Sequence, residues 1–210
     1  HTARIRSIQT LGSTVDKIDA GNRVALNLNG VGHDEIGRGH AVTTTDRWRT
    51  SDRFDASLDV LASLDHEVSR RGAYLAYIGS RELPVKVRVL GADTLAPGTS
   101  GAVRLFLPDA LPLLPGDRYV LRESGRDETI GGGEVLDIAP VTRASKARPD
   151  RSIERVVAER GWVDVDELDL LTGKAVEPTV GRWVTTPALL AETQQRVLAA
   201  IEAADELGFD

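Results

Sequence analysis

The segment 116–138, GDRYVLRESGRDETIGGGEVLDI, constrains the fold of this chain more than any other part of it. In residues 118–122 the apolar Tyr119 and Leu121 alternate with residues on the opposite face, which is the period of a half-buried strand. The glycines at 131–133 allow a backbone kink or bulge before a second strand resumes at Val135. The segment therefore predicts two strands that meet at the corner of a β-barrel.

Strand patterns of the same kind fill the first two thirds of the chain. Residues 1–45 predict strand, turn, strand, turn, strand, with glycine-rich connections, and are too short to close a barrel. Between Phe54 and Ile138 about six strand segments follow one another at the spacing typical of an antiparallel barrel or sandwich. We therefore expect one partial and one complete β-domain.

The pattern changes after Pro140. Residues 141–149 lack apolar periodicity, which predicts a linker, and Asp150 is a candidate cap for a helix that follows. The next segments predict two amphipathic helices, a short strand pair at 181–185 as a β-wing, and a long helix over 188–207. The apolar positions that define the helices are Ile153, Val156, Val157, Val165, Leu171, Leu190, Val197, Ala200 and Ile201. The expected fold class is mainly β followed by α, with a C-terminal winged helix.

Composition excludes several kinds of site. The chain has no cysteine, so it has no disulfide and no cysteine-ligated metal, which fits the reducing cytoplasm. Its four histidines are isolated from one another, and no apolar run approaches the roughly 20 residues of a membrane span. No GxxxxGK[ST] sequence occurs, and the glycine run is followed by a strand rather than the helix that a dinucleotide site requires. We expect no catalytic residue, cofactor or metal here, and because the chain lacks methionine we expect a piece of a longer protein.

Net charge is −6, and the C-terminal residues 141–210 carry 9 basic against 13 acidic side chains. An RNA contact is therefore expected from arginines on particular strands rather than from a basic coat.

The string TIGGGEVLD and the arginines before it resemble the closing strands of the third domain of elongation factor Tu-like translational GTPases. The triple glycine, and the order partial barrel, whole barrel, winged helix, are most similar to the selenocysteine-specific branch of that family, SelB. The resemblance implies four parts: 1–45, the end of the domain 2 barrel; 46–140, the domain 3 barrel; 141–149, a linker; and 150–210, the first winged helix.

The resemblance also implies a function. An intact protein of this kind binds GTP with Mg in an N-terminal domain that this chain lacks. It carries selenocysteinyl-tRNA to the ribosome at recoded UGA codons and reaches an mRNA selenocysteine-insertion hairpin through winged helices beyond this chain. It is cytoplasmic and has no membrane partner.

Three arginines are candidate binding residues. Arg23 lies in AGNRVALN, a segment that lines the aminoacyl pocket in this family, and a selenol is acidic enough to present an anion to its cation. Arg122 and Arg126 are candidate contacts to the tRNA backbone. The alternatives are a solvated strand arginine for Arg23, and pairing with Glu123, Asp127 or Glu128 for the other two.

Two other functions remain open from the sequence. One is the barrel region of another translational GTPase or of a sulfate-activation GTPase, which should not carry a winged helix. The other is a winged-helix nucleic-acid-binding regulator, against which the acidic residues 164–169 of the second predicted helix argue.

Overall fold

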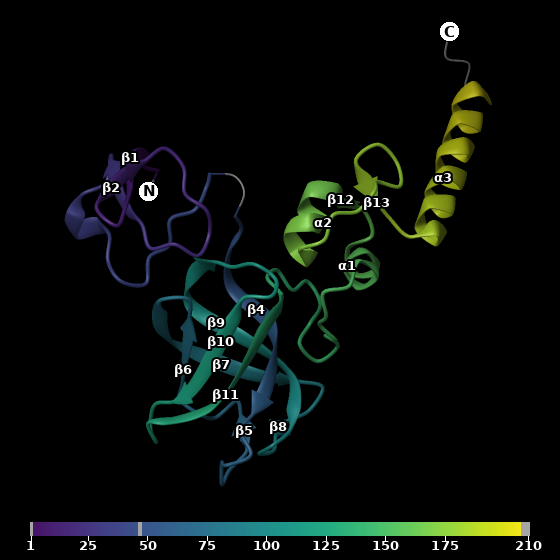
Figure 1. Ribbon diagram of the computed structural model, residues 1–210. Coiled ribbons are helices and arrows are strands. Elements are labelled where there is room, and N and C mark those ends of the chain that lie inside the picture. The colour runs from purple at the N-terminus through teal and green to yellow at the C-terminus, as the bar shows by residue number, and fades with distance from the viewer. Residues whose placement is uncertain (1, 46–47, 207–210) are drawn as a thin grey trace.

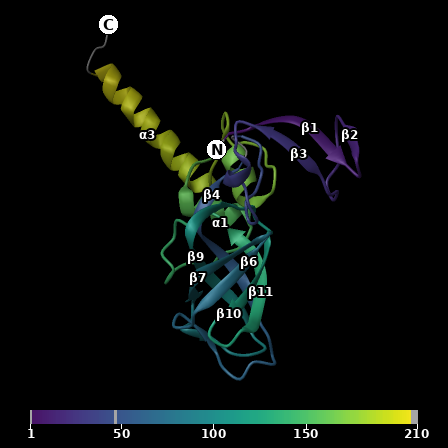
Figure 2. The ribbon, with the colours of Figure 1, turned by 90° about the vertical axis from the view of Figure 1, so that its left-hand side faces the viewer.

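The computed structural model describes residues 2–45 and 48–206. Along the chain it contains a small β-sheet, a closed β-barrel and a helical module (Figure 1). The small sheet and the helical module both lie toward one end of the barrel, and the loop that joins β10 to β11 lies at the other end (Figures 1 and 2).

The N-terminal sheet has three antiparallel strands in the order β2-β1-β3. Their bounds are Arg4–Thr10 for β1, Ser13–Val15 for β2 and Ala25–Asn29 for β3, and a short 3-10 helix, η1, covers His33–Glu35. Leu11 and Gly12 turn between β1 and β2 with φ values of 48° and 83°. Leu26 and Leu28 lie on the more protected face of β3 and Ala25 and Asn27 on the exposed face, as the alternation in the sequence predicts.

Six strands close the barrel in the order β10-β11-β4-β9-β7-β6, with β6 pairing to β10, and every pairing is antiparallel. Their bounds are β4, Thr50–Val60; β6, Tyr74–Ile78; β7, Arg81–Leu90; β9, Ser100–Pro112; β10, Arg118–Glu123; and β11, Glu128–Asp137. A two-stranded ribbon, β5 (Val68–Ser69) with β8 (Thr94–Leu95), lies beside it. Closure removes the unpaired edges that an open sheet would expose.

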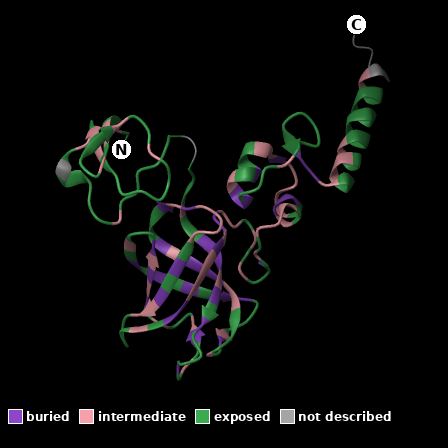
Figure 3. Cartoon of the chain, in the orientation of Figure 1, coloured by how far each residue is buried: buried purple, intermediate pink, exposed green. Residues whose placement is uncertain are grey.

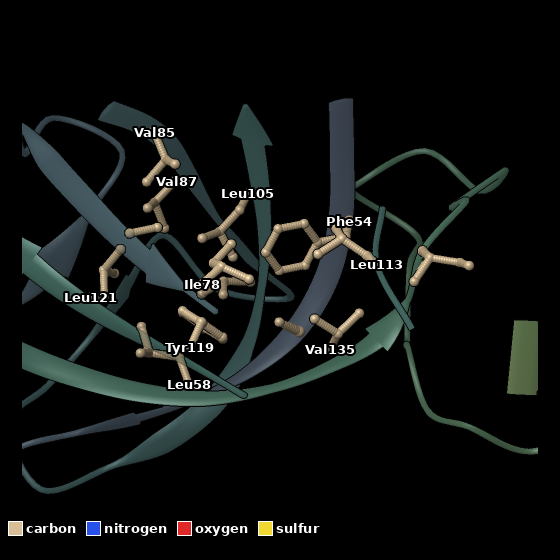
Figure 4. Packing of buried hydrophobic residues seen from close by; sticks show 14 of the residues in the cluster. Phe54, Leu58, Ile78, Val85, Val87, Leu105, Leu113, Tyr119, Leu121 and Val135 are labelled. Atoms are coloured by element: carbon tan, nitrogen blue, oxygen red, sulfur yellow. The ribbon is translucent and has the colours of Figure 1, made fainter. Parts of the chain in front are cut away.

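Alternation on β7 shows how the barrel fills its interior. Leu83, Val85, Val87 and Val89 are buried, while the residues between them are exposed. The pattern is less regular on β4 and β9, where Asp55 and Arg104 are buried between apolar neighbours (Figure 3), and the buried apolar side chains meet in the middle of the barrel (Figure 4). Phe54 and Tyr119 pack edge to face there, with ring centroids 6.0 Å apart.

The triple glycine lies inside β11 and does not interrupt it. The register irregularities fall on either side, where Ile130 and Leu136 have no direct partner in the ladder. A Cβ atom on Gly131 would lie 2.2 Å from the carbonyl oxygen of Asp59, and one on Gly133 would lie 2.0 Å from the carbonyl oxygen of Ser57. The glycines therefore allow neighbouring strands to approach closely. The sequence led us to expect a kink or bulge at the glycines, whereas the bulges lie on either side of them.

The C-terminal module contains α1 (Ile153–Arg160), β12 (Val163–Asp164), α2 (Val165–Thr172), β13 (Trp183–Val184) and α3 (Pro187–Glu206). Ser152 rather than Asp150 caps α1, since its hydroxyl accepts from the backbone N–H of Arg155, while Asp150 accepts hydrogen bonds from Ser152. Gly173, in the left-handed conformation with φ 69°, ends α2.

Two features of the module differ from the sequence prediction. The wing strand β13 pairs with β12, which precedes α2, and residues 179–183 form a tight turn beside it. The helix α3 is present, but Val197, Leu198 and Ile201 on it are 52%, 59% and 54% exposed. Its apolar side therefore does not pack against α1 and α2, and α3 projects away from the module (Figures 1 and 2).

Buried ion pairs fasten the module to the barrel. Arg104 on β9 donates two hydrogen bonds to Asp55 on β4, at 2.6 and 2.8 Å, and a third to the carbonyl of Thr142. Arg155 on α1 pairs with Asp137 at the end of β11, at 2.9 Å. The predicted linker is thus held against the barrel, and Val156, Val157 and Leu168 of the module belong to the same buried hydrophobic cluster as the barrel interior.

Among the described residues, no helix is long and apolar enough to cross a membrane.

Candidate functional site

The turn between β10 and β11 carries both arginines that the sequence singled out at this end of the barrel. Arg122 is the fifth residue of β10, and Arg126 lies in the turn of residues 124–127. Asp127 adopts a left-handed conformation there, with φ 51°. The turn thus brings Arg122 and Arg126 to one end of the molecule, although they contact different partners.

Arg122 is held by the turn itself. Its Nη2 donates to the carbonyl oxygen of Asp127 at 2.8 Å and to the carboxylate of Asp127 at 2.7 Å. Within the described part of the chain its buried Nε has no hydrogen-bond partner. One nitrogen of this guanidinium therefore binds the turn, and the buried Nε is left without a partner.

Arg126 joins a cluster that spans two loops. Its Nη1 lies 3.1 Å from Asp65, in the loop after β4, and its Nε lies 3.7 Å from Glu123 at the end of β10. His66 lies between the same two carboxylates, with Nδ1 2.8 Å from Asp65 and Nε2 2.8 Å from Glu123. The four side chains alternate in charge and tie the loop after β4 to the β10–β11 turn.

Protonation of His66 is favoured in this cluster. The hydrogen bond with Asp65 is the main reason why the pKa of His66 is raised; burial opposes the rise and the hydrogen bond with Glu123 adds to it. The same hydrogen bond, followed by the charge of Arg126, lowers the pKa of Asp65. Arg126 remains 51% exposed, so its guanidinium can still be reached from solvent.

Arg23 lies in the N-terminal sheet region, just before β3. Its side chain is exposed, and its carbonyl oxygen accepts a hydrogen bond from the hydroxyl of Thr10 at 3.1 Å. The sheet and the β10–β11 turn lie toward opposite ends of the barrel (Figures 1 and 2). The three predicted residues thus form two separate regions.

A large cavity of about 990 Å³ adjoins the N-terminal sheet. It is lined by the protected face of the sheet, including Ile5, Leu26 and Leu28, and by residues 110–112 at the end of β9. Ile5 is 46% exposed, so the apolar face of this sheet is only partly covered by the described residues.

Sequence reasoning missed the roles of Asp65 and His66, because their partners lie nearly sixty residues away along the chain. The only signal in the sequence is that Asp65 and His66 are adjacent, and an acidic residue next to a histidine is too common on protein surfaces to indicate a site. In the described ranges, no group of three or more histidine and acidic side chains is placed to hold a metal ion.

Comparison with known proteins identifies the barrel. Residues 55–142 match the family model described as "Selenocysteine-specific elongation factor, beta-barrel domain". The chain is 28% identical over 137 residues to a selenocysteine-specific elongation factor from Desulfomicrobium baculatum, an alignment that covers 65% of this chain and 22% of that protein. It is 29% identical over 138 residues to elongation factor Tu 2 of Streptomyces avermitilis, which covers 64% of this chain and 35% of that protein.

A solved structure shows the same fold. It is described as a crystal structure of bacterial selenocysteine-specific elongation factor EF-Sec, and the superposition has a TM-score of 0.71 at 20% identity. It covers 99% of this chain and 36% of that structure. The barrel of residues 55–142 therefore matches the β-barrel domain of selenocysteine-specific elongation factors (SelB), and the chain is similar in sequence to such a factor and to an elongation factor Tu.

Proposed function

We propose that this chain is the part of a SelB-type factor that binds selenocysteinyl-tRNA and connects it to the mRNA-reading end of the protein. The observation that carries the proposal is the family match over the closed barrel. The parent protein would bind GTP with Mg in a domain outside this chain and deliver its tRNA to the ribosome at recoded UGA codons.

The proposed division of the chain follows its three structural parts. The N-terminal sheet of residues 1–45 belongs to a second barrel, and its uncovered apolar face is the surface on which further strands of that barrel would pack. Residues 46–140 form the third domain, 141–149 are the connection, and 150–210 are the first winged-helix module.

In this proposal Arg23 forms part of the aminoacyl pocket. Its exposed, positively charged guanidinium attracts the selenolate of selenocysteine. A serine hydroxyl is neutral and cannot compensate for desolvation of that cation, so discrimination between the two aminoacyl groups follows from charge.

Arg122 and Arg126 contact the sugar-phosphate backbone of the tRNA. The Arg122 side chain is one-third exposed and that of Arg126 is half-exposed, which supports this role, since RNA duplexes are recognised largely through phosphate, ribose and shape. Pairing with Asp127, Asp65 and Glu123 fixes the position of both side chains before the RNA arrives.

The helical module acts as a spacer toward winged helices that read the mRNA hairpin. Asp164, Asp166 and Glu167 around α2 are acidic, and two of them pair with Arg182, which leaves little positive charge for RNA on this helix.

Substitution of Arg23 by alanine in the full-length factor tests the proposal. Loss of a charged contact of about 1.5–3 kcal/mol predicts that affinity for selenocysteinyl-tRNA falls by about 10- to 100-fold, with affinity for seryl-tRNA and GTP unchanged. Fluorescence titration with both charged tRNAs measures this. Arg38→Ala, which removes another exposed arginine near the N-terminal sheet, serves as the control. Equal losses for both tRNAs would rule out recognition of the selenolate.

A further inference from the structure

A second arginine-rich site lies on the barrel wall beside the connection to the helical module. It is a cavity of about 400 Å³ lined by Arg70, which follows β5, by Arg88 on β7, and by Arg148 in the connection. Gly91, Asp93 and Ser145 also line it. None of these residues belongs to the β10–β11 turn or to the N-terminal sheet.

The three guanidinium groups are not paired with carboxylates. Within residues 2–45 and 48–206, none of the three forms an ion pair, and Arg148 donates only to the neighbouring carbonyl of Ala147, at 2.7 Å. Asp93 is the one carboxylate in the lining, so the cavity has three positive groups against one negative group. The chain has a net charge of −6, so this group of unpaired cations is not part of a generally basic protein.

Nearby carboxylates are already committed elsewhere. Arg88 is the ladder partner of Arg104 on β9, and Arg104 holds both oxygens of Asp55. On the other side of the connection, Arg155 engages Asp137 and Asp150. The arginines of the cavity therefore cannot be neutralised by these side chains without breaking ion pairs that already exist.

The backbone that carries Arg148 is held in a turn. The backbone N–H groups of Lys146 and Ala147 both donate to the carbonyl of Arg143, at 2.8 and 3.0 Å, and Ala147 is buried. Gly91, with φ 79°, has no side chain, and the guanidinium of Arg148 lies 3.5 Å from the point that a Cβ atom on Gly91 would occupy. This turn lowers the ordering cost of binding for Arg148.

We propose that this cavity binds a phosphate of an RNA backbone, at a second RNA contact separate from the β10–β11 turn. Arginine forks match the oxygens of a phosphate in pairs, and the Ser145 hydroxyl adds a donor of the kind that commonly contacts RNA backbones. The choice of RNA among polyanions rests on the proposed function. The cavity would then extend the RNA path from the barrel toward the helical module.

The experiment compares the full chain with the triple variant R70Q/R88Q/R148Q in binding to a fluorescein-labelled RNA duplex of mixed sequence. Each neutralised phosphate contributes about 0.9 to the slope of log affinity against log salt concentration. We expect the triple variant to lower this slope by about 0.9, the contribution of one phosphate, and the affinity by about tenfold near 0.1 M salt. Arg196→Gln, which removes an exposed arginine from α3, should leave both unchanged.

Further variants and competitors identify the ligand. The variant R70K/R88K/R148K keeps the positive charges but lacks the paired donors of the guanidinium groups. Its slope of log affinity against log salt concentration should therefore match that of the wild type, while its affinity should be lower. Wild-type affinity in the triple glutamine variant overturns the proposal. So does equal competition by poly-glutamate, which would indicate an acidic protein partner, and so does tight binding of inorganic phosphate that the RNA cannot displace.

Arg126→Gln separates this proposal from the proposed function. If R126Q weakens RNA binding and the triple glutamine variant does not, the cavity proposal fails and the tRNA-binding role stands. The reverse result would remove the role of the β10–β11 turn and retain the cavity. If the wild-type chain binds no RNA, both fail.

Discussion

At the scale of single residues, the most restrictive positions are the glycines inside β11. Their neighbours are backbone carbonyl oxygens of β4 and β10, which belong to paired strands and cannot move aside as a flexible side chain can. The requirement is steric, since none of the three has a positive φ.

Gly133→Ala should therefore destabilise the protein strongly. A Cβ 2.0 Å from the carbonyl oxygen of Ser57 forces the two strands apart, and overpacking of this kind costs about 3 kcal/mol. Urea unfolding followed by circular dichroism measures the loss. Gly125→Ala in the β10–β11 turn is the matched control, because no atom lies within 4 Å of its added Cβ, and equal stability of the two variants would contradict the steric argument.

His66 makes stability depend on pH. Its pKa is raised in the folded protein, so its contribution is fully present below the unfolded-state value of about 6.5 and is lost as pH rises through the folded-state value. The free energy of unfolding of the wild type minus that of His66→Gln should therefore be larger near pH 5.5 than near pH 9.

Chemical denaturation at several pH values checks this difference. His40→Gln is the control: the Nδ1 of His40 accepts a hydrogen bond from the backbone N–H of Gly37, and no carboxylate pairs with it among the described residues. A wild-type advantage that is constant with pH, or that grows at high pH, would show that the His66 cluster does not titrate as proposed.

At the scale of elements, the sequence predicted the barrel strands well because alternation reports which face of a strand is buried. Five of the six predicted segments overlap β6, β7, β9, β10 and β11, whereas the first, residues 58–64, covers only the last three residues of β4. The sequence could not place the bulges beside Ile130 and Leu136, since bulges depend on how neighbouring strands approach each other.

Long-range partners explain the remaining differences. The pairing of β13 with β12 joins residues some twenty positions apart. The apolar stripe of α3 resembles that of a packed helix, although no described residue covers it.

At the candidate site, sequence reasoning named Arg122 and Arg126 and allowed for their pairing with acidic neighbours. It missed His66 and Asp65, because loop positions carry no periodic signal that relates them to a distant turn. The binding roles of Arg23, Arg122 and Arg126 stay predictions.

At the scale of the whole molecule, the barrel and the helical module are joined by charge as well as by apolar contact. Arg155, whose side chain is 12% exposed, contacts Asp137, Asp150 and Glu159, and Asp137 is almost completely buried. Removing one partner of such a pair leaves an uncompensated buried charge.

Arg155→Met should therefore uncouple the two parts. We expect a loss of about 3 kcal/mol, with α1 and α2 losing hydrogen-exchange protection at lower urea than β4 and β9. Exchange measured by mass spectrometry follows both regions at once. Arg151→Met is the control, because Arg151 reaches Glu134 only at the surface, at 3.4 Å. Parallel loss of protection in helices and strands would contradict separate unfolding of the module.

The projecting helix α3 has a geometrical consequence. It is 20 residues long, which at about 1.5 Å per residue makes a rod of about 30 Å. Thr186 caps its first turn, since its hydroxyl accepts a hydrogen bond from the backbone N–H of Leu189, and the helix begins three residues after β13. Each residue inserted into α3 would shift anything beyond it by about 1.5 Å and rotate it by about 100°. The number of residues in α3 thus determines two quantities for any group attached to its C-terminal end: its distance along the helix axis and its rotation about that axis.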